Sequence, residues 1–117
     1  MKTLTQDQIK TLVREFHAET SEDIIGLFSI VQEIGELCTD DDVLLEETLI
    51  VVEALLADGM VAGDPPYYPD GYKPWPDQDP LKVINRIRSE WLQLGHTPDI
   101  PDIVWFGPSK QSKRVLR

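Results

Sequence analysis

The stretch that decides the fold is TDDDVLLEETLIVVEALLADGMVAGDPPYYPDGYKPW, residues 39–75. Thr39 is followed by three aspartates, and carboxylates in a first helical turn are stabilised by the helix dipole. Apolar residues then continue to Asp58-Gly59, where glycine can adopt the left-handed conformation that ends a helix. The β-branched residues at 50–52 could indicate a strand, but the length of the run and its glutamates favour a helix. The first part of the stretch therefore predicts a helix that begins after Thr39 and ends at Gly59.

The second part of the stretch predicts a small β-ribbon. A short apolar run, Met60-Val61-Ala62, is followed by a loop rich in proline, glycine and aspartate and then by Tyr72-Lys73-Pro74-Trp75. Two such runs joined by a turn-rich loop are typical of paired antiparallel strands. Pro74 has no backbone N–H to donate, so the second strand is expected at an edge.

Two further helices are predicted upstream. Thr5 and Gln8 have the spacing of a capping box, and the apolar residues that follow fall on one helical face. Thr20-Ser21, followed by two acids, predicts the start of a second helix that runs to Leu37.

Downstream, Asp79-Pro80 has the composition of a helix start and Gly95 that of a helix end. Residues 103–106 are expected to form a short buried strand or extended segment, which could join the ribbon. The predicted fold class is mostly α and winged-helix-like, with four helices plus a small two-stranded β-ribbon; the alternative is a four-helix bundle without a ribbon. Residues 1–107 are expected to form a single globular domain, and residues 108–117 a basic, mobile tail.

Composition favours a cytoplasmic protein. The chain has 117 residues, of which 41% are hydrophobic and 27% charged, values that are ordinary for a soluble domain. No apolar run reaches the roughly 18 residues of a membrane span, and the N-terminus lacks the apolar core of a signal peptide. The single Cys38 cannot form an internal disulfide, which fits a reducing compartment.

Charge is the most unusual property of the chain. The net charge is −10, and residues 15–72 contain fifteen Asp and Glu but no Lys or Arg. Such a segment repels phosphate backbones and attracts basic surfaces. The predicted third helix in particular has no cation for DNA phosphates or base edges. We therefore expect a basic protein as partner, and neither nucleic acid nor a membrane.

Catalytic signals are weak. The chain has one Cys and two His, too few for a zinc site of the usual spacing, and no serine or cysteine nucleophile motif. Glu33 and Glu36 lie one helical turn apart, with Glu46, Glu47 and Glu53 on the next helix, which loosely resembles the all-helical nucleotide pyrophosphatases that bind magnesium through E-x-x-E and E-x-x-D pairs. The second pair is missing. We expect no enzyme activity and no cofactor, with magnesium-dependent nucleotide hydrolysis as an alternative.

The second half of the chain resembles a group of small, largely uncharacterised bacterial proteins. The shared pattern is Gly63-Asp64, Pro74-Trp75, Arg86-Ile87, Glu90-Trp91, Leu94-Gly95, Pro98, Asp102-Ile103 and Trp105-Phe106. Some small acidic bacterial proteins of this kind are immunity proteins that neutralise a toxin. The resemblance implies the same role here, without catalytic residues.

Charge and resemblance together predict a non-catalytic protein that binds and neutralises a basic partner, as an immunity protein against a nuclease-type toxin. The alternative is a regulatory or protein-interaction module of the winged-helix type. Exposed carboxylates and loop aromatics can be used for an interface without loss to the fold, and tyrosine is enriched at interfaces. The predicted partner-binding residues are Asp40, Asp41, Asp42, Glu46, Glu47, Tyr67 and Tyr68.

Overall fold

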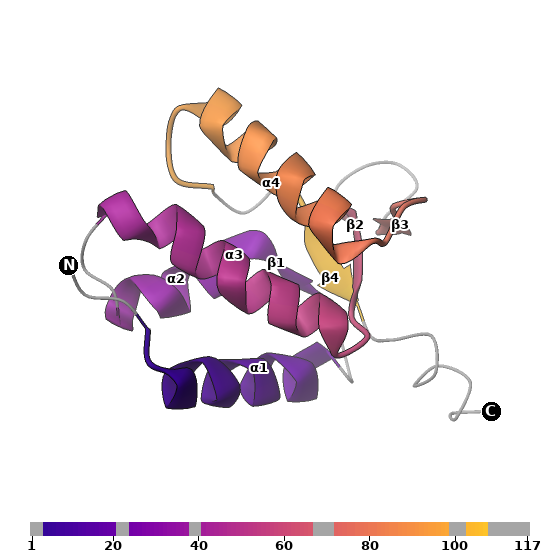
Figure 1. Ribbon diagram of the computed structural model, residues 1–117. Helices are drawn as coiled ribbons and strands as arrows, with labels where there is room; N and C mark the ends of the chain where they lie inside the picture. The colour runs from indigo at the N-terminus through magenta and orange to yellow at the C-terminus, as the bar shows by residue number, and fades with distance from the viewer. Residues whose placement is uncertain (1–3, 21–23, 38–40, 67–71, 99–102, 108–117) are drawn as a thin grey trace.

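Helices surround a small antiparallel sheet in the computed structural model (Figure 1), which describes residues 4–20, 24–37, 41–66, 72–98 and 103–107. The elements in chain order are α1 (Gln6–Thr20), β1 (Ile25–Gly26), α2 (Leu27–Leu37), α3 (Asp41–Ala57), β2 (Val61–Asp64), β3 (Lys73–Pro74), α4 (Pro80–Leu94) and β4 (Trp105–Gly107). The expected mostly helical class is confirmed. The segment 108–117, predicted to be a tail, lies outside the described residues.

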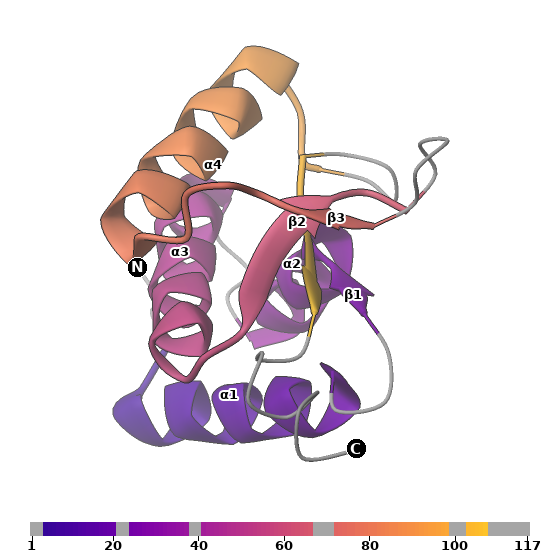
Figure 2. The same cartoon turned by 90° about the vertical axis from the view of Figure 1, so that its right-hand side faces the viewer.

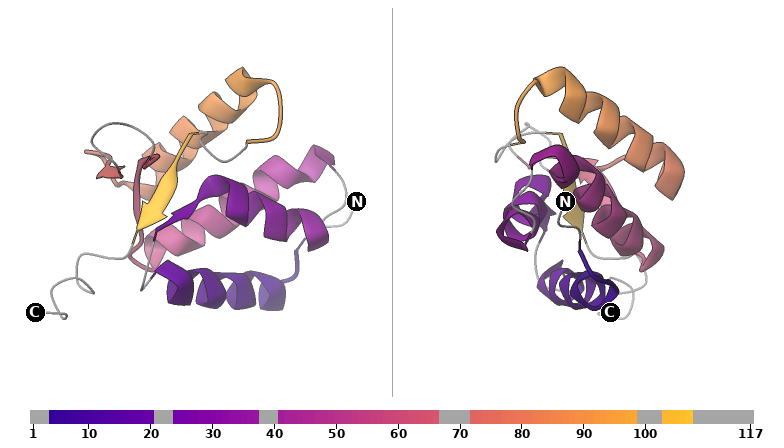
Figure 3. Two further views of the ribbon diagram at one scale, coloured as in Figure 1. Left: turned by 180° about the vertical axis from the view of Figure 1, so that it is seen from behind. Right: turned by 60° about the vertical axis from the view of Figure 1, so that its left-hand side comes forward.

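Helix α3 is the centre of the molecule, with α1, α2 and α4 packed around it (Figure 3). Its run LIVVEALL places apolar residues on almost every face, and a helix of that composition must be covered on most sides. Val51, Val52 and Leu55 have no exposed surface. The exposed side chains that are described on α3 form one narrow strip of Glu46, Ile50, Glu53 and Ala57.

The strands form one four-stranded antiparallel sheet in the order β1-β4-β2-β3. Strand β4 lies between β1 and β2 although it comes last in the chain (Figure 2). The pairing of β2 with β3, the edge position of Pro74 and the addition of β4 agree with the sequence prediction. The predicted count of two ribbon strands is wrong, because β1 was not foreseen. Its two residues pair with β4 some eighty positions along the chain, which no local pattern can indicate.

The predicted start of the second helix at Thr20-Ser21 is also wrong. Thr20 ends α1, where its Oγ1 donates to the carbonyls of Phe16 and His17, each at 3.1 Å. The chain is extended at Ile25, and α2 begins only at Leu27. A threonine hydroxyl can bond back to a preceding turn as readily as it can cap a following one, so the residue type alone left both outcomes open.

The predicted helix ends at Thr5, Gly59, Asp79 and Gly95 are confirmed, whereas the predicted start at Thr39 lies outside the described residues. The Thr5 amide donates to the Gln8 side chain at 2.9 Å and the Gln8 amide donates to Thr5 Oγ1 at 3.1 Å. The Asp79 side chain accepts from Lys82 at the start of α4, and Gly95 ends that helix with a left-handed φ of 76°. Gly59 ends α3 with a φ of 103°.

One face of the sheet is buried against the helices and the other carries aromatic rings. Ile25, Ala62 and Phe106 lie in register on the buried face. On the other face Trp105 lies between Gly26 and Gly63, and a Cβ at Gly26 would meet the Trp105 ring at 2.7 Å. These glycines are required because side chains in their place would collide with the rings.

Two aromatic residues of the hairpin hold it to the rest of the fold. The Tyr72 hydroxyl donates to the Val61 carbonyl at 2.6 Å, and burial raises the pKa of Tyr72 to about 12. Trp75 is buried, and its Nε1 donates to Asp64 at 2.9 Å. The guanidinium of Arg86, on α4, lies 3.6 Å from the centre of the Trp75 ring, a cation–π contact. Arg86 also forms an ion pair with Glu90, one turn along α4, at 2.8 Å.

Candidate functional site: an acidic groove between α1 and α2

Of the seven predicted partner-binding residues, only Glu46 and Glu47 have side chains that the structure describes. Asp40, Tyr67 and Tyr68 lie outside the described residues, and Asp41 and Asp42 are placed only as backbone of the first turn of α3.

Glu46 is exposed as expected, but it already has a partner. Its two carboxylate oxygens accept from Arg88, on α4, at 2.9 and 3.1 Å. This hydrogen-bonded pairing lowers the pKa of Glu46. Because the guanidinium neutralises much of its charge, Glu46 contributes less to an acidic surface than the sequence indicated.

Glu47 does not lie on the surface at all, which corrects the expectation that it is an exposed interface residue. Only 7% of it is exposed, and its Oε1 accepts from the Leu4 amide at 2.8 Å. The Glu47 side chain points at the segment that leads into α1, where its carboxylate is the acceptor for the buried Leu4 amide. Glu47 therefore has a structural role.

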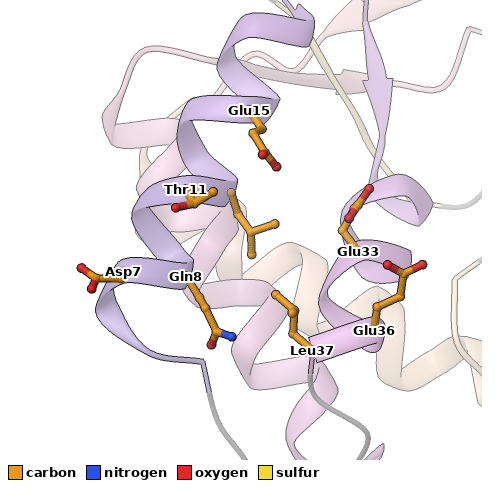
Figure 4. A pocket seen from close by; sticks show the side chains of 8 residues that line it. Asp7, Gln8, Thr11, Glu15, Glu33, Glu36 and Leu37 are labelled. Carbon is orange, nitrogen blue, oxygen red and sulfur yellow. The ribbon is translucent and has the colours of Figure 1, made fainter.

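The structure gathers a different set of carboxylates, between α1 and α2 (Figure 4). A cavity of about 340 Å³ lies there, with Leu12 and Leu37 at its base. Figure 4 shows Glu15 and Leu37 pointing into the space between the helices, Glu33 and Glu36 on the opposite wall, and Asp7 pointing away. The full lining is Asp7, Gln8, Thr11, Leu12, Glu15, Glu33, Glu36 and Leu37.

A second cavity of about 480 Å³ continues the first towards the end of α1. It is lined by Glu15, Phe16, Ala18, Glu19 and Glu33, so Glu15 and Glu33 border both cavities. The two cavities together are called the acidic groove below. Its five carboxylates, at positions 7, 15, 19, 33 and 36, are all exposed.

No ion pair found within the described ranges involves a carboxylate of the acidic groove. The pairs there are His17–Asp58, Lys82–Asp77, Arg86–Glu90 and Arg88–Glu46. An apolar base with an unneutralised acidic rim can accept the aliphatic stem of a lysine or arginine while the carboxylates bind its charged end. The site is therefore suited to a cationic protein surface.

The glutamates considered for magnesium are dispersed. Glu33 and Glu36 border the acidic groove, whereas Glu46 and Glu47 bind Arg88 and the Leu4 amide. In the part of the chain that the structure describes, no three His, Cys, Asp or Glu side chains are grouped so that they could hold a metal ion. Nor is any helix in that part both long and apolar enough to cross a membrane.

The predicted partner-binding residues include none of the α1 carboxylates that border the acidic groove. Glu15 and Glu19 lie one turn apart, and Glu33 and Glu36 have a similar spacing, so each pair could be recognised as one acidic helix face. That the two faces meet depends on how α1 and α2 pack, which the spacing does not show. Comparison with known proteins adds nothing to this assignment, since no family model, curated protein or solved structure matches the chain.

Proposed function

We propose that this protein binds a basic protein partner in the acidic groove and neutralises it without catalysing a reaction. The partner in this proposal is a nuclease-type toxin domain, and the protein acts in the cytoplasm as its immunity protein. The observation that carries the proposal is the set of four exposed glutamates around an apolar base, Glu15, Glu19, Glu33 and Glu36, none of them in an ion pair within the described residues.

A nuclease is the class of basic protein that such a groove suits best. Nucleases bind phosphate backbones through lysines and arginines, and those cations are attracted to any regular array of negative charge. Carboxylates repeated along two helices supply such an array. The whole-chain charge of −10 adds long-range attraction that speeds association at low salt.

The predicted aspartates at the start of α3 can extend the same surface. Only four positions separate Leu37, at the base of the groove, from Asp41, so the chain between them spans at most about 14 Å. Asp40, Asp41 and Asp42 are thus proposed to contact the partner beside the groove, whereas Glu47 is excluded by its burial.

The proposal can be tested with a nuclease toxin encoded next to the gene of this protein. We expect the protein to block hydrolysis of a fluorescent DNA or RNA substrate at a ratio of about 1:1. Reversing two groove charges, with Glu15→Lys and Glu33→Lys, should slow association and weaken its salt dependence. The matched control is Glu53→Lys, which reverses an exposed carboxylate on α3 outside the groove.

Inhibition that is equally strong in the groove variant and the control would exclude the acidic groove as the binding site. Absence of any complex with a cognate toxin would exclude the immunity role. Both variants change exposed residues, so neither should lower the thermal midpoint substantially, and this serves as the check on folding.

A second candidate is a regulatory or interaction module of the winged-helix type. The order of a helix, a short strand, two helices and an antiparallel hairpin favours it. The central position of α3 counts against recognition through that helix, because most of its surface is buried. Such a module would bind its partner without blocking an active site, so the hydrolysis assay separates the two candidates.

A further inference from the structure

A second groove lies on the other flank of α1, where this helix packs against α3. Its volume is about 450 Å³. The lining consists of Ile9, Lys10, Val13, Arg14 and His17 from α1, Ala54 from α3, and Asp58, which directly follows α3. We call it the cationic groove.

The base of the cationic groove is apolar. Ile9 and Val13 pack against the core but remain partly exposed. Ile50, which is 43% exposed, precedes Ala54 by one turn of α3 and extends the apolar strip along this helix. A contiguous strip of exposed apolar side chains with a polar border is characteristic of an interaction surface.

The border of the groove is positively charged. Lys10 and Arg14 lie one turn apart on α1, both are exposed, and neither takes part in an ion pair found among the described residues. The carboxylate of Asp58 is engaged at one end, where its Oδ2 lies 2.8 Å from Nδ1 of His17. That contact is close but does not have hydrogen-bond geometry. Among the described residues, the groove thus presents two cations without an ion-pair partner, in a half of the chain whose charged residues are mostly acidic.

We propose that the cationic groove docks an amphipathic helix of a partner protein, with an apolar stripe bordered by two acids one turn apart. The stripe would cover Ile9, Val13 and Ile50, and the acids would pair with Lys10 and Arg14. The groove is open to solvent along its length, which suits a helix better than a small molecule, since small ligands bind where most of their surface is enclosed. This inference does not rest on the acidic groove, which has the opposite charge.

The test uses the full chain and two synthetic helical peptides that share one leucine stripe. One peptide has glutamates one turn apart beside the stripe, and the other has lysines at the same positions. In an NMR titration of the ¹⁵N-labelled protein, the acidic peptide should shift the amide signals of Ile9, Val13 and Ala54. The double variant Lys10→Glu and Arg14→Glu should raise the Kd by about tenfold or more, because two attractive contacts become repulsive.

Two control variants separate charge from packing. Lys82→Glu makes the same kind of change on α4, at a side chain that is 73% exposed, and should leave the Kd unchanged. Ile50→Gln removes apolar contact without changing charge and should weaken binding of the acidic peptide. Both change exposed residues, so their thermal midpoints should stay close to that of the unmodified protein.

Three results would overturn the inference. The lysine peptide could bind as tightly as the glutamate peptide, or the shifts could fall away from α1 and α3. Alternatively, decanoate could shift these amides while neither peptide does, which would assign the groove to a small anionic amphiphile. Inhibition of a toxin through the acidic groove would be unaffected by any of these results, so the two proposals fail separately.

Discussion

Glu47 shows how one side chain can be misjudged from its type. A buried carboxylate is costly unless it is hydrogen-bonded, and here it accepts from the Leu4 amide, 43 positions away in the chain. We expect Glu47→Ala to lower the free energy of unfolding by about 2 kcal/mol, because the buried N–H loses its acceptor. Glu47→Gln keeps a neutral acceptor and should cost about 1 kcal/mol. Urea denaturation measures both, with exposed Glu53→Ala as control; equal effects at positions 47 and 53 would contradict the structural role.

Tyr72 gives a pH dependence that can be assigned to one residue. Its pKa is raised from 10.0 to about 12 by burial, so the folded state retains a proton that the unfolded state releases. The free energy of unfolding should therefore fall as pH rises from about 10 to about 12, since the folded state then binds more protons than the unfolded state. Tyr72→Phe removes the hydrogen bond to Val61 and should lower the free energy of unfolding by about 1 kcal/mol at pH 7. Above pH 10 the free energy of unfolding of this variant should fall less than that of the unmodified protein. Parallel curves for the two proteins above pH 10 would refute this assignment.

The hairpin of β2 and β3 requires glycine at position 63, because the neighbouring strand leaves no room for a side chain. A Cβ at Gly63 would lie 2.6 Å from the Lys73 carbonyl oxygen and 2.7 Å from the Tyr72 ring. Gly63→Ala should therefore push the strands apart and lower the free energy of unfolding by about 1–3 kcal/mol. Gly35, inside α2, is the matched control, because nothing lies within 4 Å of its added Cβ. Gly35→Ala should raise the free energy of unfolding by roughly 0.5–1 kcal/mol. Chemical denaturation that gives both substitutions the same sign would contradict the assigned role of Gly63.

Helices and strands could be predicted from the sequence where the contacts that define their ends are between residues close together in the chain. Helix ends of this kind depend only on residues a few positions apart. The predicted ends at Thr5 with Gln8, at Asp79 and at Gly95 are all found in the structure. Strand β1 could not be predicted in this way, because Ile25 and Gly26 become a strand only through pairing with β4. The candidate site follows the same rule. Its acidic helix faces are visible in the spacing, but their meeting requires the packing of α1 against α2.

For the whole molecule, the acids of the acidic groove stand out because they lie together without basic partners among the described residues. Outside the groove, Glu46 and Asp58 have basic partners, whereas the exposed Glu53 has none in the described ranges. Like charges that face one another across a groove repel and destabilise the compact state. In the proposed function, this repulsion is the cost of keeping the carboxylates available for a partner.

Two substitutions that each remove negative charge should therefore change the free energy of unfolding in opposite directions. Glu15→Gln with Glu33→Gln should raise the free energy of unfolding by about 0.5–1 kcal/mol at low salt, because repulsion in the groove is removed. Glu46→Gln should lower it by up to about 1 kcal/mol, since the exposed pair with Arg88 is lost. Both differences should shrink in about 0.5 M NaCl, where the screening length is only a few ångström. Thermal and urea unfolding at the two salt concentrations measure them. Destabilisation by the groove double variant would mean that these carboxylates support the fold, and the case for a binding surface between α1 and α2 would then fail.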